Sequence, residues 1–533
     1  METLVSTHTT AAAQHPTRNT QDTLVGLGAA ELARRIAAGE TSSAAVVEAH
    51  IARMEAVNPA LNAAVVKLYD QARAQAKAAD ARQGQGLPLG PLHGVPITIK
   101  ECLDVAGTPS SFGLPSRKDA RVAADDVYVA RLRAAGAIPL AKTNVAQLLF
   151  YYESDNPVYG RTNHPTHPDR SPGGSSGGEA ALIASGASPL GLGTDLGGSV
   201  RIPSAFCGIT GLKATAGRFP DSGRGSVAWG QRAIASQVGV LAPKVADVTL
   251  GLRVMEAGRD NAVDPAPALG DPARIDVAGL HVAYFEDDGV FAPAPGARRA
   301  VREAAEALRR RGVKVTAWKL PDGRAALDLC GALLFGDNGA GFRALLGKDK
   351  AVPQLKDLMA LSRLPGGLLA LLRSLLGAIG QQGMAENLGI FGQADAAEYW
   401  RNVEAQSAHR ERFTRALDEL PGGPADAILC PPCALPAFTH GASRDLVTAG
   451  IYAILFNLLG WPAGVVPFSK VRPDEEIGRA TTRDKVGSTA RKVEQGSAGL
   501  PLGVQIAARP WREDMVLALL AVLEAEGETG PRV

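Results

Sequence analysis

The chain has 533 residues, of which 46% are hydrophobic and 21% charged, and its 56 basic and 54 acidic side chains leave a net charge of +2. This composition excludes a disordered chain, a collagen and a coiled coil. Because no long run of one charge sign occurs, the sequence predicts no nucleic-acid partner and indicates a small molecule or another protein.

The first 24 residues are expected to form a mobile polar tail. They lack the apolar core of a signal peptide or a membrane anchor. The five cysteines are odd in number and scattered, which is typical of a reducing compartment, so we expect a cytoplasmic protein. Cys430 and Cys433 form an isolated C-x-x-C, which we interpret as a loop after a buried strand rather than a metal or redox site.

Helices and strands alternate in the first part of the chain. Residues 29–66 carry apolar side chains at helical spacing, and Gly39 and Asn58-Pro59 predict a division into two helices. Residues 94–101 predict a buried strand that ends on Lys100. A helix over 127–135 and a strand over 137–141 follow, and this alternation favours an α/β architecture.

Two turns rich in glycine and serine come next. Residues 171–179 hold Ser175 and open an Ala-rich helix, and residues 196–201 hold Ser199 after a buried strand over 189–195. Further on, a strand over 280–285, a helix over 297–311 and a strand over 313–318 predict a β-α-β unit that continues the sheet.

Residues 355–395 contain the most unusual apolar segment. Within it, residues 368–379 are apolar nearly all round, with Arg373 as the one charge, and are too short to span a bilayer. Three interpretations stay open: a buried core helix, a cap over an apolar channel that lies on a membrane surface, and a subunit contact. Residues 447–468 are also uncharged, but Pro462 and its neighbouring glycines favour a buried helix followed by a core strand.

The first glycine turn allows one chemical interpretation on its own. Gly173-Gly174-Ser175-Ser176-Gly177 matches the G-x-S-x-G pattern, which would make Ser175 the nucleophile of an α/β-hydrolase. Such an enzyme needs a downstream histidine, and among His281, His409 and His440 only His440 is plausibly placed. A phosphate loop is not expected, because no Gly-Lys-Ser/Thr follows the glycines.

A second interpretation joins three separated residues, Lys100, Ser175 and Ser199. A serine hydroxyl is a poor nucleophile until a base removes its proton, and a lysine serves as that base if burial favours its neutral form. Glycines in both turns let backbone N–H groups approach a developing oxyanion. They stand at positions 173, 174, 177, 178, 197 and 198.

Together and in this order, the motifs resemble those of the amidase signature family, hydrolases with a Ser-cisSer-Lys triad. The matching residues are Gly94-Val95-Pro96 with Lys100, Lys142-Thr143-Asn144, residues 172–178, residues 193–203, and Gly208 with Gly211-Leu212-Lys213. The resemblance runs from about residue 27 to residue 526 and is closest to the fatty acid amide hydrolase branch. It implies a single large domain over residues 25–530, with a mixed, mostly parallel central β-sheet covered by helices on both faces and with residues 355–395 inserted as a helical cap.

The resemblance also implies roles for individual residues. Ser199 would be the nucleophile, Ser175 the proton shuttle and Lys100 the base, with a cis peptide bond between Gly174 and Ser175. The oxyanion hole would consist of the N–H groups of Leu196, Gly197, Gly198 and Ser199. Asp195 and Arg201 would support the loop, and the acyl site would be lined by Leu149, Phe150 and Gly174.

The expected function is therefore hydrolysis of apolar acyl, fatty acyl or aryl amides through an acyl-enzyme, without metal or cofactor; esters and carbamates also fit. Residues 366–380 would contact a membrane peripherally, and a homodimer stays open. The alternatives are an amidotransferase subunit of the same family that releases ammonia, the α/β-hydrolase-type esterase, and a catalytically inactive binding protein. Ala214 and residues 239–243 depart from the family pattern and put only local loop geometry in doubt.

Overall fold

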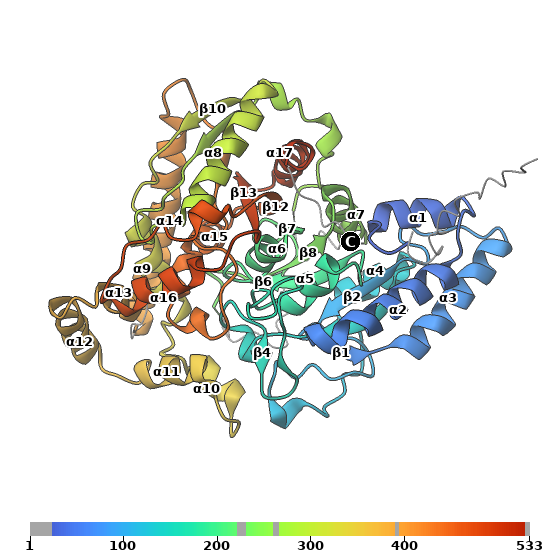
Figure 1. The fold of residues 1–533 in the computed structure, drawn as a ribbon, viewed down its shortest axis with the longest axis horizontal. Coiled ribbons are helices and arrows are strands. Elements are labelled where there is room, and N and C mark those ends of the chain that lie inside the picture. Colours follow the sequence, from blue (N-terminus) through green and yellow to red (C-terminus); the bar gives the residue numbers. More distant parts are fainter. Residues whose placement is uncertain (1–23, 221–230, 259–265, 390–393, 528–533) are drawn as a thin grey trace, which may run out of the picture.

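An eleven-stranded sheet forms the centre of the computed structural model, which describes residues 24–220, 231–258, 266–389 and 394–527 (Figure 1). The expected tail lies outside these residues, except for Leu24. The strands follow the spatial order β1 (Ala64–Lys67), β3 (Ile138–Thr143), β2 (Pro96–Lys100), β6 (Gly191–Asp195), β8 (Gln237–Ala242), β7 (Thr210–Lys213), β12 (Ala463–Lys470), β13 (Pro501–Ala508), β11 (Ala427–Cys430), β9 (His281–Tyr284) and β10 (Lys314–Ala317). A separate two-stranded sheet pairs β4 (Asp155–Asn156) with β5 (Gly160–Arg161).

The single domain and the mixed sheet are confirmed, but the expected parallel majority is wrong. Four pairings within the described residues are parallel and six are antiparallel. Parallel pairing is confined to the blocks β3-β2-β6 and β11-β9-β10, where helices connect the strands. The strands between them, β8, β7, β12 and β13, run antiparallel to their neighbours.

Two groups of helices pack against the sheet, and the helices within each group also contact one another. Helices α7, α8 and α17 form one group, and α5 and α6 form the other. Outside residues 323–388 the helices are α1 (Ala29–Ala37), α2 (Ser43–Leu61), α3 (Tyr69–Gly84), α4 (Val127–Ala134), α5 (Gly177–Ala184), α6 (Arg201–Cys207), α7 (Val245–Glu256), α8 (Pro295–Arg310), α14 (Ala396–Asp418), α15 (Ile451–Leu458), α16 (Lys485–Glu494) and α17 (Glu513–Glu526).

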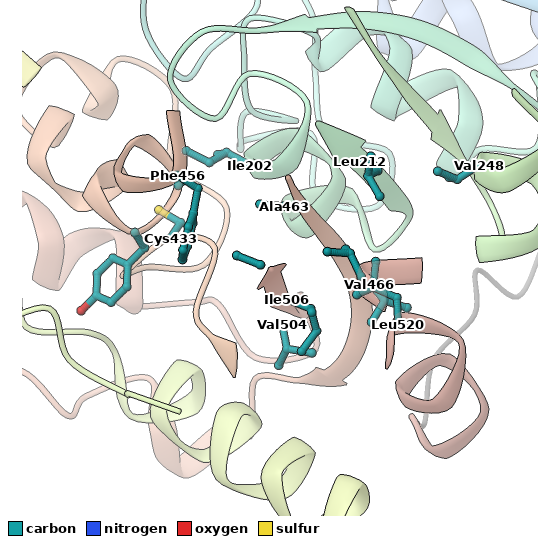
Figure 2. Packing of buried hydrophobic residues seen from close by; sticks show 14 of the residues in the cluster. Ile202, Leu212, Val248, Cys433, Phe456, Ala463, Val466, Val504, Ile506 and Leu520 are labelled. Carbon is teal, nitrogen blue, oxygen red and sulfur yellow. The ribbon is translucent and has the colours of Figure 1, made fainter. Parts of the chain in front are cut away.

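The main core lies where the second half of the chain closes on the first. Figure 2 shows side chains from α6, β7 and α7 packed against side chains from β12, β13 and α17, all of them buried. The labelled residues of this cluster are Ile202, Leu212, Val248, Cys433, Phe456, Ala463, Val466, Val504, Ile506 and Leu520. Residues 447–468 supply α15 and β12, so the predicted buried helix followed by a core strand is confirmed.

The division of residues 29–66 differs from the expectation at its second boundary. Helix α2 continues through Asn58 and Pro59 and ends only at Leu61, and the chain then enters β1 at Ala64. The Asn58 side chain accepts hydrogen bonds from the N–H groups of Ala63 and Ala64. The Asn-Pro pair therefore terminates the helix a few residues downstream, by capping the chain that leaves it.

Residues 323–388 form a string of short helices, of which α10, α11 and α12 extend from the body at the lower left of Figure 1. The helices are α9 (Gly323–Leu334), α10 (Ala340–Leu346), α11 (Pro353–Leu361), α12 (Gly366–Ala378) and α13 (Gln382–Leu388). The expected cap, residues 355–395, contains α12, α13 and most of α11. Helix α12 is not a buried core helix: Leu369 is its one buried residue, and Leu371 and Leu375 are 55% and 53% exposed.

Among the described residues no single helix has the length and apolar character to cross a membrane. The pair α11 and α12 meets that requirement only jointly, across a bend of 118°.

Candidate active site

Lys100 lies at the end of β2 and points into a fully buried polar site. Its Nζ donates hydrogen bonds to Ser175 Oγ at 2.7 Å, to Thr194 Oγ1 at 2.8 Å and to the Thr194 carbonyl at 3.2 Å. Because β2 and β6 are parallel neighbours, the carboxyl ends of both strands deliver Lys100 and Thr194 to the same edge. The contact between Lys100 and Thr194 joins residues 94 positions apart, so the sequence around Thr194 does not predict it.

Ser175 occupies the turn before α5, next to a cis peptide bond with Gly174, as expected. The turn tolerates little besides glycine. A Cβ on Gly174 would lie 2.3 Å from the carbonyl oxygen of Glu153, and Gly173 has φ +87°. The Ser175 side chain is 1% exposed, so its hydroxyl is shielded from bulk water.

Ser199 lies in the second turn, between β6 and α6, and is partly exposed to a cavity. The two turns touch through their backbones, since Ser176 N donates to Ser199 O at 3.3 Å. The structure thus brings Lys100, Ser175 and Ser199 to one edge of the sheet.

The expected set of four oxyanion-binding amides is reduced to three in this structure. The N–H of Gly198 donates to Asp195 Oδ1 at 2.8 Å and so belongs to the support of the turn. Leu196, Gly197 and Ser199 remain the candidate donors, and all three line the cavity.

Asp195 and Arg201 form a fully buried ion pair beneath the turn. Arg201 donates to Asp195 through Nε at 3.0 Å and Nη2 at 2.9 Å, and its other bonds go to Ala453 O, Asn457 Oδ1 and Gln505 Oε1. Asp195 also accepts from the N–H groups of Gly198 and Val200. Although burial alone would raise it, the guanidinium beside it holds the pKa of Asp195 well below its usual range. These contacts join both residues to the turn that holds Ser199, and their role in supporting the loop stays a prediction.

A buried acid, Glu179, contacts Thr98, two residues before Lys100 on β2, and no sequence motif assigns it a role. Glu179 on α5 accepts from Thr98 Oγ1 at 2.5 Å and from Thr143 Oγ1 at 2.9 Å. Burial raises the pKa of Glu179 to about 8. The sequence feature that could have identified Glu179 is an acid within an otherwise apolar helix, because an acid on the buried face of a helix requires polar partners.

The cavity at Ser199 is small and almost entirely apolar. Its volume is about 90 Å³, and its wall includes Leu149, Phe150, Tyr151 and Tyr152, together with side chains of α9 and α15. A larger cavity of about 450 Å³ lies next to it, bounded by side chains of α11, α12 and α13. The two cavities share lining residues, namely Phe150, Tyr151, Phe335 and Val447. Leu149 and Phe150 thus lie where the acyl site is expected, whereas Gly174 is buried against Glu153.

The histidine required by the α/β-hydrolase interpretation lies elsewhere. His440 Nε2 is 3.1 Å from the carbonyl oxygen of Pro168, and His440 Nδ1 has no hydrogen-bond partner. His281 begins β9, as the predicted strand over 280–285 implies, and His409 is buried on α14. The partner of the Ser175 hydroxyl is a lysine, and the esterase interpretation is therefore wrong.

Comparisons with known proteins agree with this geometry. Residues 45–517 match the family model described as Amidase. The chain is 34% identical over 515 residues to the fatty-acid amide hydrolase 1 of Sus scrofa, covering 94% of this chain and 86% of that protein. It is 32% identical over 499 residues to a subunit of the glutamyl-tRNA(Gln) amidotransferase of Roseiflexus castenholzii, covering 90% and 98%. A solved fatty acid amide hydrolase has the same fold, with a TM-score of 0.81 at 24% identity over 96% of this chain and 87% of that one.

Proposed function

The chain belongs to the amidase family, and on this premise we propose that it hydrolyses amides with apolar acyl groups through Lys100, Ser175 and Ser199. The observation that carries the proposal is the 2.7 Å hydrogen bond between Lys100 Nζ and Ser175 Oγ, in a buried site beside the turn that holds Ser199.

The proposed reaction begins with proton transfer along the three side chains. Lys100 serves as the base once its amine is neutral, and it takes the proton of Ser175 while Ser175 takes that of Ser199. Ser199 Oγ then bonds to the amide carbonyl carbon. As the C–N bond breaks, the same path returns a proton to the leaving nitrogen, which departs only as an amine. Water cleaves the acyl-enzyme by the same route.

The oxyanion formed in this step would lie against the second turn. Leu196, Gly197 and Ser199 present their N–H groups there, and a preorganised donor of this kind typically contributes about 10²–10³-fold in rate. The buried pair of Asp195 and Arg201 holds the turn in place, so the donors need no reorganisation during the reaction.

The substrate class is inferred from the two cavities, which are lined mainly by apolar side chains, although Asp357, Arg444, Asp445 and Lys485 also line the larger one. An acyl group bound at Ser199 would meet Leu149 and Phe150, and a longer one would continue past Phe150 into the larger cavity below the cap. The outer face of α12 exposes Leu368, Leu371, Leu375 and Ile379. Exposed leucines on a helix with one charge favour a lipid surface, so we propose that residues 355–395 form a cap that contacts a membrane through residues 366–380.

The proposed chemistry is tested with single substitutions and an anilide substrate. Ser199→Ala and Lys100→Ala should each abolish release of p-nitroaniline from acyl p-nitroanilides, and His440→Ala should leave it unchanged. Full turnover by Ser199→Ala would refute the assignment. A series of acyl chain lengths, measured with and without liposomes, tests the substrate class: a preference for short acyl groups with no liposome effect would refute the lipid part alone.

The amidotransferase relative supports a second candidate function, release of ammonia for a partner protein. Amide hydrolysis by the purified single chain would exclude a dependence on partners. The exposed apolar face of α12 favours the first candidate, because a membrane contact has no part in the second.

A further inference from the structure

The peptide bond between Gly197 and Gly198 is held at both of its polar ends. Its carbonyl oxygen accepts a hydrogen bond from the Tyr152 hydroxyl at 3.1 Å, and its N–H donates to Asp195 Oδ1 at 2.8 Å. The C=O and N–H of one peptide point in opposite directions, so the two bonds together fix the rotation of the peptide plane.

This restraint matters because the two residues are glycines. Glycine has no Cβ to restrict rotation, and Gly198 has φ +105°, a region that other residues avoid. A free Gly-Gly peptide would therefore reorient at low cost. The N–H groups of Gly197 and Ser199 belong to the two adjoining peptides, which share the Cα atoms of Gly197 and Gly198 with this peptide plane.

Tyr152 is itself held firmly in place. Its side chain is 9% exposed and forms part of the wall of the cavity at Ser199. Its ring lies against Gly450, where a Cβ would come within 2.3 Å of the Tyr152 hydroxyl oxygen, so the hydroxyl has little freedom to move away.

The residues after Tyr152 contact the other serine turn. The backbone of Glu153 packs against Gly174, and Ser154 Oγ accepts from Gly177 N at 3.0 Å and donates to Gly173 O at 3.2 Å. Three consecutive residues thus contact the turn of Ser175 and the turn of Ser199. The chain before them is strained, since Tyr151 has φ +74°, and such strain persists where the surroundings enforce it.

We propose that Tyr152 is a positioning residue, whose hydroxyl holds the Gly197–Gly198 peptide so that the neighbouring N–H groups converge on the oxyanion. This inference rests on the proposed function, because it assigns the second turn to an acyl-transfer step. Burial raises the pKa of Tyr152, so the hydroxyl stays protonated and keeps donating at neutral and mildly alkaline pH.

The test removes the hydroxyl alone, in Tyr152→Phe. We expect kcat for an anilide substrate to fall about 10- to 100-fold, somewhat less than for loss of an oxyanion donor itself, while KM stays within about threefold. A trifluoromethyl ketone analogue forms a covalent bond with Ser199 Oγ through its carbonyl carbon and so places an oxyanion in the hole. Affinity for this analogue should fall in parallel with kcat. Affinity for the corresponding alcohol, which forms no oxyanion, should not change.

Tyr452→Phe is the matched control. Tyr452 is also a buried tyrosine whose hydroxyl donates to a backbone carbonyl, that of Phe291 at 2.9 Å, and accepts from the N–H of Asp288 at 3.2 Å; neither partner belongs to the two serine turns. It should keep kcat within about threefold, which separates loss of a buried hydrogen bond from loss of positioning. Thermal unfolding of both variants, compared with the parent chain, shows whether each is folded at the assay temperature.

Three outcomes are distinguished. Parallel losses in kcat and ketone affinity, with the alcohol unaffected, support the proposal. Unchanged kcat and ketone affinity in Tyr152→Phe would overturn it, and so would equal losses for ketone and alcohol, which indicate general loosening of the cavity. Failure of the proposed function is recognised separately, by turnover in Ser199→Ala.

Discussion

Glu179 makes the stability of the buried site depend on pH in a calculable way. The folded protein surrounds this carboxyl with the hydroxyls of Thr98 and Thr143, and burial raises its pKa from 4.5 to about 8. In the unfolded chain the carboxyl faces water and titrates at its ordinary value. Between these two values the folded state holds a proton that the unfolded state has released.

The sign follows from proton linkage. Because the folded state binds the extra proton, raising the pH from about 4.5 to about 8 lowers the free energy of unfolding, and the loss levels off above that range. Each pH unit within the window costs about 1.4 kcal/mol, so the loss between about pH 5 and about pH 8 amounts to about 3 to 4 kcal/mol.

Glu179→Gln isolates this contribution, since glutamine matches the neutral acid in shape and never ionises. Urea unfolding of both proteins at several pH values gives the difference in free energy of unfolding, in which the other titrating groups cancel. The variant should be nearly as stable as the parent at about pH 5 and more stable by about 3 to 4 kcal/mol at about pH 8. A difference that stays within about 0.5 kcal/mol over this range would show that Glu179 is not held neutral.

Three further predictions concern the supports of the site. Asp195→Asn leaves the Arg201 charge buried without its partner and should lower the free energy of unfolding by about 3 to 5 kcal/mol; urea unfolding measures this, and a loss below about 1 kcal/mol would contradict it. Leu371→Asp changes a residue that is 55% exposed, so it should leave the urea midpoint of unfolding nearly unchanged but reduce co-sedimentation of the protein with liposomes. Undiminished co-sedimentation would count against the membrane contact. Gly450→Ala places a Cβ within 2.3 Å of the Tyr152 hydroxyl oxygen, so it should lower both kcat and thermal stability, with overpacking costing about 1 to 3 kcal/mol; normal values of both would show that the ring moves freely.

The sequence predicts those parts of the site that depend on local backbone chemistry. Lys100 is expected at the end of a strand, and Ser175 and Ser199 in glycine turns, because Val-Ile runs favour extended backbone and Gly-Gly pairs permit tight turns wherever they occur. The approach of Tyr152 to Gly197 joins residues 45 positions apart, and no pattern within either segment records it.

For some elements the sequence predicts the helix or strand but not what packs around it. A helix that is apolar all round is compatible with a core and with a lipid surface, and only the structure shows that Leu371 and Leu375 on α12 face outward. The same holds for strand direction: the apolar residues of β12 identify a buried strand, but its antiparallel pairing with β7 depends on how the connecting chain returns.

The place of β12 and β13 in the sheet has a consequence for synthesis of the protein. These strands are the last two in the chain, yet they lie between β7 and β11 and are the link that joins the two halves of the sheet. A nascent chain still lacking β13 therefore exposes an open sheet edge on each half, with the apolar side chains that the finished core covers. The two halves of the sheet therefore join only after β13 has been synthesised.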